Sequence, residues 1–118
     1  MEFIERKIIF HGSHFVDFYL EQTTKVQEKI EFVFHIIKRV ERVSKKFLRP
    51  MENADGLYEI RVEYGSNIYR IFCCFDEGRI VVLFNAFQKK TQKTPQKEIE
   101  KALRLKRAYF DLKKNLRK

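Results

Sequence analysis

Three hydrophobic segments separated by short turn sequences constrain most strongly what this chain can fold into. The segments are 57–64, 68–75 and 79–87, with turns at 65–67 and 76–78. The first segment alternates apolar and charged side chains, which is typical of a strand with one buried face. Because connections this short join antiparallel neighbours, the pattern predicts a three-stranded meander.

Helical periodicity precedes these segments. Five apolar residues recur at spacings of three and four, which places them on one face of a helix; they are Val26, Ile30, Val33, Ile37 and Val40. This helix is expected to run from Thr23 or Thr24 to about Val43. A strand at 3–10 and a short helix at 14–21 are expected before it, with a connector at 44–56 after it.

A second amphipathic helix is expected at the C-terminal end. Thr94 and Pro95 are typical of an N-cap followed by the first helical residue, so this helix is predicted from Pro95 to about Lys114. Its apolar stripe comprises Ile99, Ala102, Leu105, Tyr109, Leu112 and Leu116. The order of a strand, two helices, three strands and a helix predicts an α+β domain with one twisted sheet. A length of 118 residues suits a single domain over residues 1–118.

Composition narrows the class of protein. Hydrophobic residues make up 44% of the chain, which is enough for a packed core without a metal ion or a disulfide. The adjacent Cys73 and Cys74 point to opposite faces of their strand, so we expect two buried free thiols and no zinc site. No apolar run is long enough to cross a bilayer, and the N-terminus lacks the hydrophobic region of a secretion signal. We therefore expect a cytoplasmic protein without a metal or a small-molecule cofactor.

Positive charge is concentrated at the C-terminal end. The net charge is +9; residues 1–88 hold 13 basic and 13 acidic side chains, whereas residues 89–118 hold 12 basic and 3 acidic ones. Lys89, Lys90 and Lys93 are expected in a short connection beside the N-terminus of the last helix, where anions bind favourably. This distribution predicts a polyanionic partner, either a nucleic acid or an acidic protein.

Three motifs resemble one family of proteins. They are LYEIRV at 57–62, IYRIFCCF at 68–75 and VVLFNAFQKKTQKTPQKEIEKA at 81–102. Together they resemble the RelE/ParE toxin superfamily, and in particular its phage-associated HigB-like branch, over residues 55–105. The resemblance implies a RelE-like fold and the toxin of a type II toxin–antitoxin pair. It also implies cleavage of messenger RNA on the ribosome and a helix-turn-helix (HigA-like) antitoxin as protein partner.

The resemblance assigns roles to basic residues. Metal-independent RNA cleavage uses the 2′-hydroxyl as nucleophile, and cations stabilise the charge that develops on the phosphorus. Arg70 matches the strand position of a phosphate-binding arginine, Lys90 matches a second basic catalytic residue, and Arg61 lies in the preceding strand. These three are the expected catalytic residues. The residues expected to bind RNA or its phosphates are Lys89, Lys93, Phe87 and Thr91.

Other interpretations of these residues stay open at the level of sequence. Arg61 is equally compatible with an ion pair to a neighbouring glutamate, and Phe87 with core packing. All three histidines lie in the N-terminal half, so no general acid or base is identified. Two other classes of function also remain: a ParE-like inhibitor of DNA gyrase without catalysis, and a non-toxic basic RNA-binding module.

Overall fold

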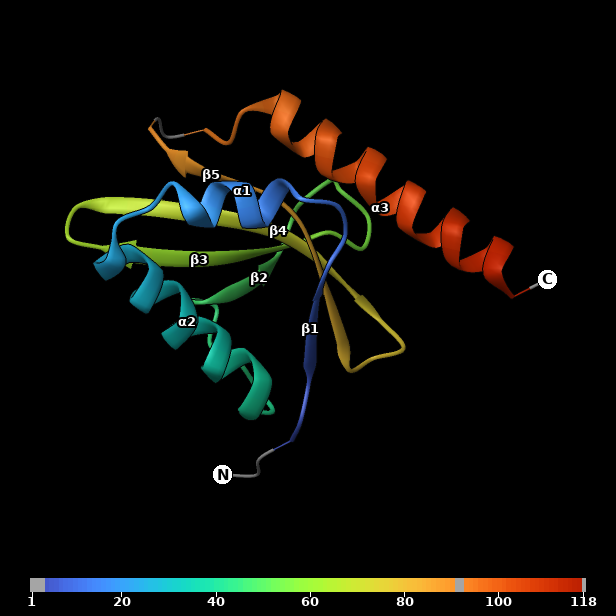
Figure 1. Cartoon of the computed structure of the whole chain (residues 1–118), viewed down its shortest axis with the longest axis horizontal. Coiled ribbons are helices and arrows are strands. Elements are labelled where there is room, and N and C mark those ends of the chain that lie inside the picture. Colours follow the sequence, from blue (N-terminus) through green and yellow to red (C-terminus); the bar gives the residue numbers. More distant parts are fainter. Residues whose placement is uncertain (1–3, 91–92, 118) are drawn as a thin grey trace.

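The computed structural model describes residues 4–90 and 93–117, which form a five-stranded sheet with helices on both faces (Figure 1). In chain order the elements are β1 (Lys7–Phe10), α1 (His14–Leu20), α2 (Thr24–Arg39), β2 (Leu48–Pro50), β3 (Tyr58–Tyr64), β4 (Asn67–Asp76), β5 (Ile80–Lys89) and α3 (Gln96–Leu116). The strand order is β1-β5-β4-β3-β2. The predicted α+β class is confirmed.

The sheet is larger than the predicted meander and is mixed. Strands β3, β4 and β5 pair antiparallel in sequence order, as expected. However, β1 adds to β5 in parallel, and β2 adds to the other edge of β3. The prediction of a connector over 44–56 therefore missed β2. With only three residues, this strand is too short for alternation to reveal it.

Helices α1 and α2 cover one face of the sheet. The buried residues Val26, Ile30, Val33 and Ile37 of α2 form one core cluster with inward-facing residues of β3, β4 and β5. Thr23 caps α2, since its Oγ1 accepts a hydrogen bond from the Val26 amide at 3.3 Å.

Helix α2 ends at Arg39, before the predicted Val43. The Arg6 guanidinium donates hydrogen bonds to the carbonyl oxygens of Ile37, Val40 and Glu41 at 2.8, 2.6 and 2.5 Å. A side chain from outside the helix therefore satisfies carbonyl oxygens at its C-terminal end. A local sequence pattern does not predict a helix end that depends on such a distant residue.

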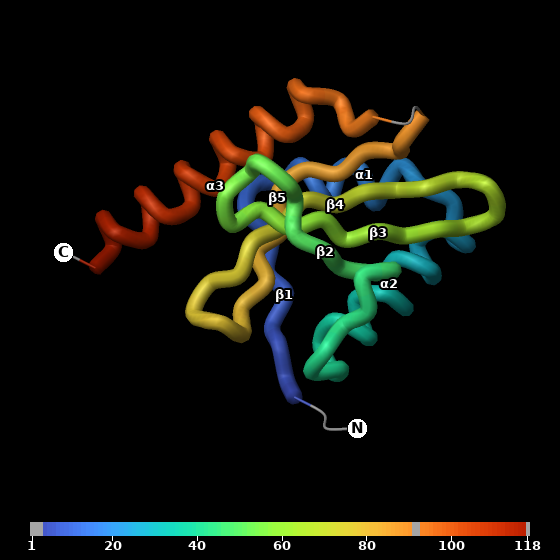
Figure 2. Tube along the Cα trace, turned by 180° about the vertical axis from the view of Figure 1, so that it is seen from behind, coloured from blue at the N-terminus to red at the C-terminus, as the bar shows by residue number. Residues whose placement is uncertain are grey.

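Helix α3 covers part of the opposite face and then continues past the sheet (Figure 2). Ala102 is the one α3 residue that is completely buried among those described. Leu112 and Leu116 are 53% and 77% exposed, so the predicted apolar stripe was wrong for its last two members. The prediction that Thr94 caps this helix was also wrong, because α3 begins at Gln96 behind Pro95 without a side-chain cap.

A β-bulge in β5 changes which side chains face α3. Ile71 pairs with Ala86 and Cys73 pairs with Leu83, so β5 holds one extra residue at this point. Asn85 lies in the bulge, is 1% exposed, and donates to the Glu98 backbone oxygen at 3.1 Å and to its carboxylate at 3.0 Å. After the bulge, the alternation of β5 is reversed relative to a regular strand.

The two cysteines lie as predicted. Cys73 and Cys74 are buried free thiols that belong to the core clusters on opposite faces of the sheet. Burial raises the pKa of the Cys74 thiol to about 11. No described helix is long and apolar enough to span a membrane.

Candidate active site

Four cations from four strands meet on the α3 side of the sheet, next to the part that α3 covers. Directly opposite residues of antiparallel strands share a face. Arg49 pairs with Glu59, Arg61 with Arg70, and Arg70 with Phe87, while Lys89 pairs with Ile68, two residues before Arg70. Phe72, which follows Arg70 on this face, packs in the same core cluster as Ala102 of α3. We call Arg49, Arg61, Arg70 and Lys89 the basic cluster.

A buried carboxylate organises two members of this cluster. Glu59 is 1% exposed, and its Oε2 accepts a hydrogen bond from Nη1 of Arg70, which is itself 3% exposed. The same oxygen accepts from Nε of Arg49 at 3.2 Å. Burial lowers the pKa of Arg70, and the charges of Arg49 and Arg61 lower it further, against the effect of Glu59. Nε of Arg70 is buried without a hydrogen-bond partner among the described residues.

Arg61 and Lys89 lie on the strands on either side of Arg70 and are less deeply buried than Arg70. The Arg61 side chain is 24% exposed, and its Nη2 donates to Oε1 of Glu63 at 2.7 Å. Lys89 is half-buried. Burial lowers the pKa of Lys89, and the nearby charges of Arg70, Arg61 and Arg49 lower it further, opposed by Glu59.

The residues that were predicted to follow or end β5 lie in different environments. Lys89 belongs to β5, so the prediction that it lies in the connection was wrong. Lys90 and Lys93 are exposed beyond the strand end, and Thr91 lies outside the described residues. Phe87 packs against Phe72 with ring centroids 5.6 Å apart, on the same face as Arg70.

Sequence reasoning missed Glu59 and Arg49. The signal for Glu59 was available, because alternation places it on the same face as Arg61. Its contact with Arg70 depends on the pairing of β3 with β4, which alternation does not specify. No sequence pattern indicated that Arg49 belongs to the site, since its strand was predicted to be part of a connector.

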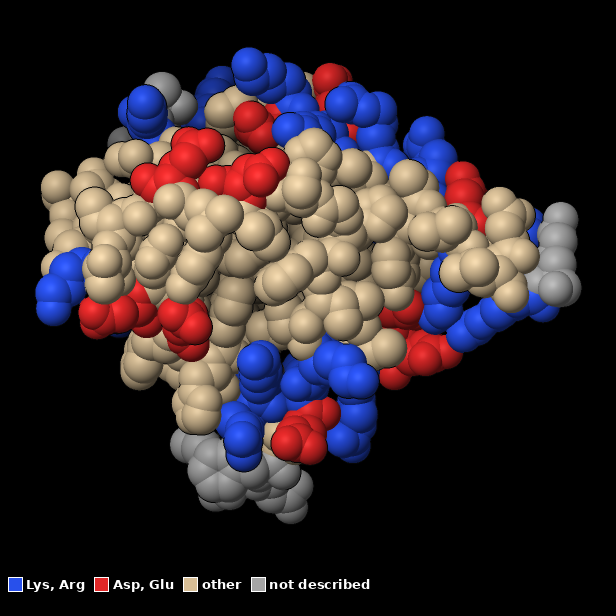
Figure 3. All heavy atoms as spheres, viewed as in Figure 1, with Lys and Arg blue, Asp and Glu red and all other residues tan. Residues whose placement is uncertain are grey.

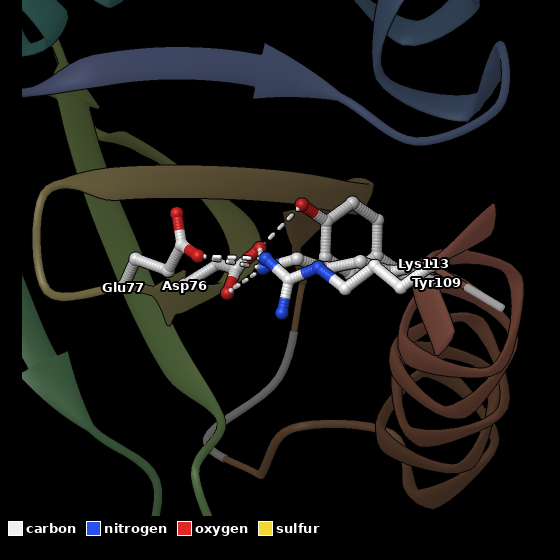
Figure 4. Close-up of polar contacts among 5 residues, drawn as sticks. Asp76, Glu77, Tyr109 and Lys113 are labelled. Atoms are coloured by element: carbon white, nitrogen blue, oxygen red, sulfur yellow. Dashed lines mark hydrogen bonds and ion pairs between the residues drawn. The ribbon is translucent and has the colours of Figure 1, made fainter. Parts of the chain in front are cut away.

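A second polar group holds the C-terminal half of α3 to the β4–β5 hairpin (Figure 4). The carboxylate of Asp76 accepts hydrogen bonds from the Tyr109 hydroxyl at 2.7 Å and from the Lys113 ammonium at 2.6 Å. Glu77 accepts from Arg117 at 2.8 Å. We call these five residues the C-terminal clamp. The clamp uses Lys113 of α3 and Arg117, which follows the helix, in ion pairs. Other Lys and Arg side chains lie along the outer side of this helix (Figure 3).

The basic cluster has the chemistry of a site for a phosphodiester. Its four cations are offset only in part by two carboxylates, Glu59 and Glu63, within hydrogen-bond distance of its arginines. Guanidinium and ammonium groups fixed on a sheet stabilise charge that builds up on phosphate oxygens. Across the described part of the chain, no group of three or more His, Cys, Asp or Glu side chains is arranged to hold a metal ion.

Comparison with known proteins gives one assignment. Residues 17–107 match the family model described as phage-derived protein Gp49-like (DUF891). No curated protein matches the chain significantly. The Gp49-like family is a family of RelE-like toxins of type II toxin–antitoxin systems, which implies an antitoxin as protein partner. Because the match spans residues of α1 through α3 and well over half of the chain, this protein belongs to the Gp49-like family of phage-derived, RelE-like type II toxins.

Proposed function

We propose that this protein is a HigB-like toxin that cleaves messenger RNA on the ribosome without a metal ion. The single observation that carries the proposal is the basic cluster, in which Arg61, Arg70 and Lys89 occupy the face of the sheet that α3 partly covers. Membership of a toxin family supports the same proposal. In this proposal the whole chain acts as one toxin domain in the cytoplasm, and a helix-turn-helix, HigA-like antitoxin neutralises it.

The proposed reaction divides the work among the cations. The 2′-hydroxyl of the RNA loses its proton to solvent water and attacks the adjacent phosphorus to form a cyclic phosphate, and the 5′-oxygen of the next nucleotide leaves. Arg61 and Arg70 stabilise the charge on the phosphorane oxygens, as preorganised donors do in other phosphoryl reactions. Lys90, to which the resemblance gave a catalytic role, is exposed beyond the end of β5, and in this proposal it holds neighbouring phosphates together with Lys93 and Thr91. Phe87 borders the site from β5.

Lys89 is the residue we propose as proton donor to the leaving oxygen. Burial and three neighbouring arginines lower its pKa, and an ammonium with a lowered pKa is a stronger acid near neutral pH. Glu59 is a positioning residue in this proposal, because it holds Arg70 and Arg49 in place through its Oε2 atom.

The first test is cleavage of a defined messenger RNA in a reconstituted translation reaction. We expect Arg61→Ala and Lys89→Gln each to lower the cleavage rate at least tenfold, since both remove a cation that the transition state needs. Arg79→Ala is the matched control, because this exposed arginine precedes β5 at the other end of the strand. The control is expected to cut at the wild-type rate.

The outcomes separate the remaining classes of function. Cleavage by folded Arg61→Ala and Lys89→Gln proteins at the wild-type rate would refute the proposed site. Growth arrest with linearised DNA and intact messenger RNA would indicate a ParE-like gyrase inhibitor instead. No arrest and no cleavage by the wild type would leave a basic RNA-binding module.

A further inference from the structure

A small pocket adjoins Arg61 on the side away from Arg70. It measures about 180 Å³ and is lined by Lys29, Lys46, Phe47, Arg61, Glu63 and Gly65. These residues come from α2, from the segment before β2, and from β3 and the turn after it. Helix α2 begins beside the β3–β4 hairpin, as seen from both sides of the molecule (Figures 1 and 2). We call this site the edge pocket.

The edge pocket carries an excess of positive charge. Three of its lining residues are cations, and one, Glu63, is an anion. Glu63 is already bound to Arg61 at 2.7 Å. The Nε atom of Arg61 is buried and has no hydrogen-bond partner among the described residues. The pocket is therefore electrostatically suited to an anionic group.

Two phenylalanine rings stand next to these cations. Phe32 is 50% exposed, and its ring packs edge-on against Phe47 with centroids 6.4 Å apart. The ammonium of Lys29 lies 4.9 Å from the centre of the Phe32 ring, and that of Lys46 lies 5.6 Å from the Phe47 ring. Exposed aromatic faces beside lysines are the combination that binds single-stranded nucleic acid, with bases stacking on rings and phosphates on cations.

From these features we propose that the edge pocket binds one nucleotide of the RNA strand, next to the nucleotide whose linkage the basic cluster cuts. The inference rests on the proposed function for the identity of the strand. Arg61 connects the two sites, because it belongs to both the basic cluster and the edge pocket. The phosphate of this nucleotide contacts Lys29 and Lys46, and its base stacks on Phe32.

The test separates binding from cleavage by using an RNA that cannot be cut. A fluorescent, fully 2′-O-methylated oligonucleotide of about eight residues lacks the attacking hydroxyl. Fluorescence anisotropy then gives its Kd for the purified protein. We expect Lys29→Gln/Lys46→Gln and, separately, Phe32→Ala to weaken binding about tenfold each. The lysine variant is also expected to show a shallower dependence of affinity on salt.

The matched control removes the same charge elsewhere. Lys38→Gln/Lys114→Gln changes two exposed lysines that do not line the edge pocket. It is expected to bind within about twofold of the wild type. A 4-thiouridine oligonucleotide provides a second readout, with photocrosslinks expected on peptides that contain Phe32 or Phe47.

Three results would overturn the inference. They are unchanged affinity in both the lysine variant and Phe32→Ala, equal weakening in the control variant, and crosslinks confined to other peptides. Each of these results would overturn the inference whether or not the wild type cuts messenger RNA, because the oligonucleotide cannot be cut. Conversely, a wild type that binds through the pocket but never cuts on the ribosome would refute the proposed function and leave the edge pocket supported.

Discussion

At the scale of single residues, the arrangement of the basic cluster depends on Glu59. One carboxylate oxygen of this buried residue binds both Arg70 and Arg49. Without Glu59, the buried guanidinium of Arg70 would lie beside the positive charges of Arg49 and Arg61 with no negative charge to offset them. Arg70 therefore has a structural role beside any catalytic one. Loss of cleavage in an Arg70 variant is informative only when its stability is measured as well.

Replacement of Glu59 is expected to destabilise the protein strongly. Glu59→Gln should lower the free energy of unfolding by about 3 kcal/mol, because the buried Arg70 loses its counter-charge. The control is Arg49→Gln, which removes the partner whose side chain is 38% exposed; it should cost less than about 1 kcal/mol. Urea unfolding measures both values. Equal losses in the two variants would contradict the central position of Glu59.

At the scale of elements, polar contacts hold α3 near both of its ends. Asn85 of the β5 bulge binds Glu98 in the first turn, and the C-terminal clamp holds the later turns. Burial would raise the pKa of Asp76, but hydrogen bonds from Lys113 and Tyr109 outweigh it and lower the pKa. Burial and the bond to Asp76 raise the pKa of Tyr109 to about 12. The clamp contributes most when Asp76 is ionised and Tyr109 is protonated.

The clamp is expected to stabilise α3 over a limited pH range. The pKa of Asp76 is lowered from 3.8, so its contribution is present above that pH and is lost as the pH falls through the lower folded-state value. The pKa of Tyr109 is raised from 10.0, so its contribution is present below pH 10.0 and is lost as the pH rises towards about 12.

Absorbance titration of the tyrosines provides the measurement. The wild type should contain a phenol that ionises near pH 12, and Asp76→Asn should shift this phenol towards its ordinary range. Tyr109→Phe identifies the signal, since the late transition should disappear. Hydrogen exchange of the last turns of α3 should become faster in Asp76→Asn. An unaltered titration in that variant would show that the clamp does not set the pKa.

At the scale of the whole molecule, the basic residues at the C-terminal end fall into two groups, those in ion pairs with acidic residues and those with no ion pair shown. Lys113 and Arg117 are bound to acidic residues of the β4–β5 hairpin. Lys97, Arg104 and Arg107 are exposed on the same helix, and no ion pair is shown for them among the described residues. If the protein acts on the ribosome, the second group of cations should make most of the long-range contribution of α3 to binding RNA.

Ribosome binding at increasing salt tests this difference. Lys97→Gln/Arg104→Gln should weaken binding at low salt and reduce the steepness of the salt dependence, because phosphate contacts are lost. Lys113→Gln/Arg117→Gln removes the same number of charges but should change the salt dependence less while lowering the stability of α3. A salt dependence that is flat in the wild type would refute electrostatic docking altogether.

Local patterns in the sequence were sufficient for most of the elements, though not for β2, and for part of the site. The alternation of 57–64 and the apolar stripe of α2 repeat over neighbouring residues, so they indicated β3, α2 and the buried faces of both. Charge counts located the basic end of the chain for the same reason. These features depend only on the order of nearby side chains, and the structure retains them.

The tertiary structure alone decided which of these side chains meet. The bulge at Asn85 turns Phe87 and Lys89 to the face of Arg70, and the pairing of β2 with β3 brings Arg49 to Glu59. Strict alternation from Leu83 would have placed Phe87 and Lys89 under α1 and α2. Register and bulges are set by contacts between segments far apart in the chain. A pattern of neighbouring residues therefore does not predict the register or the bulges.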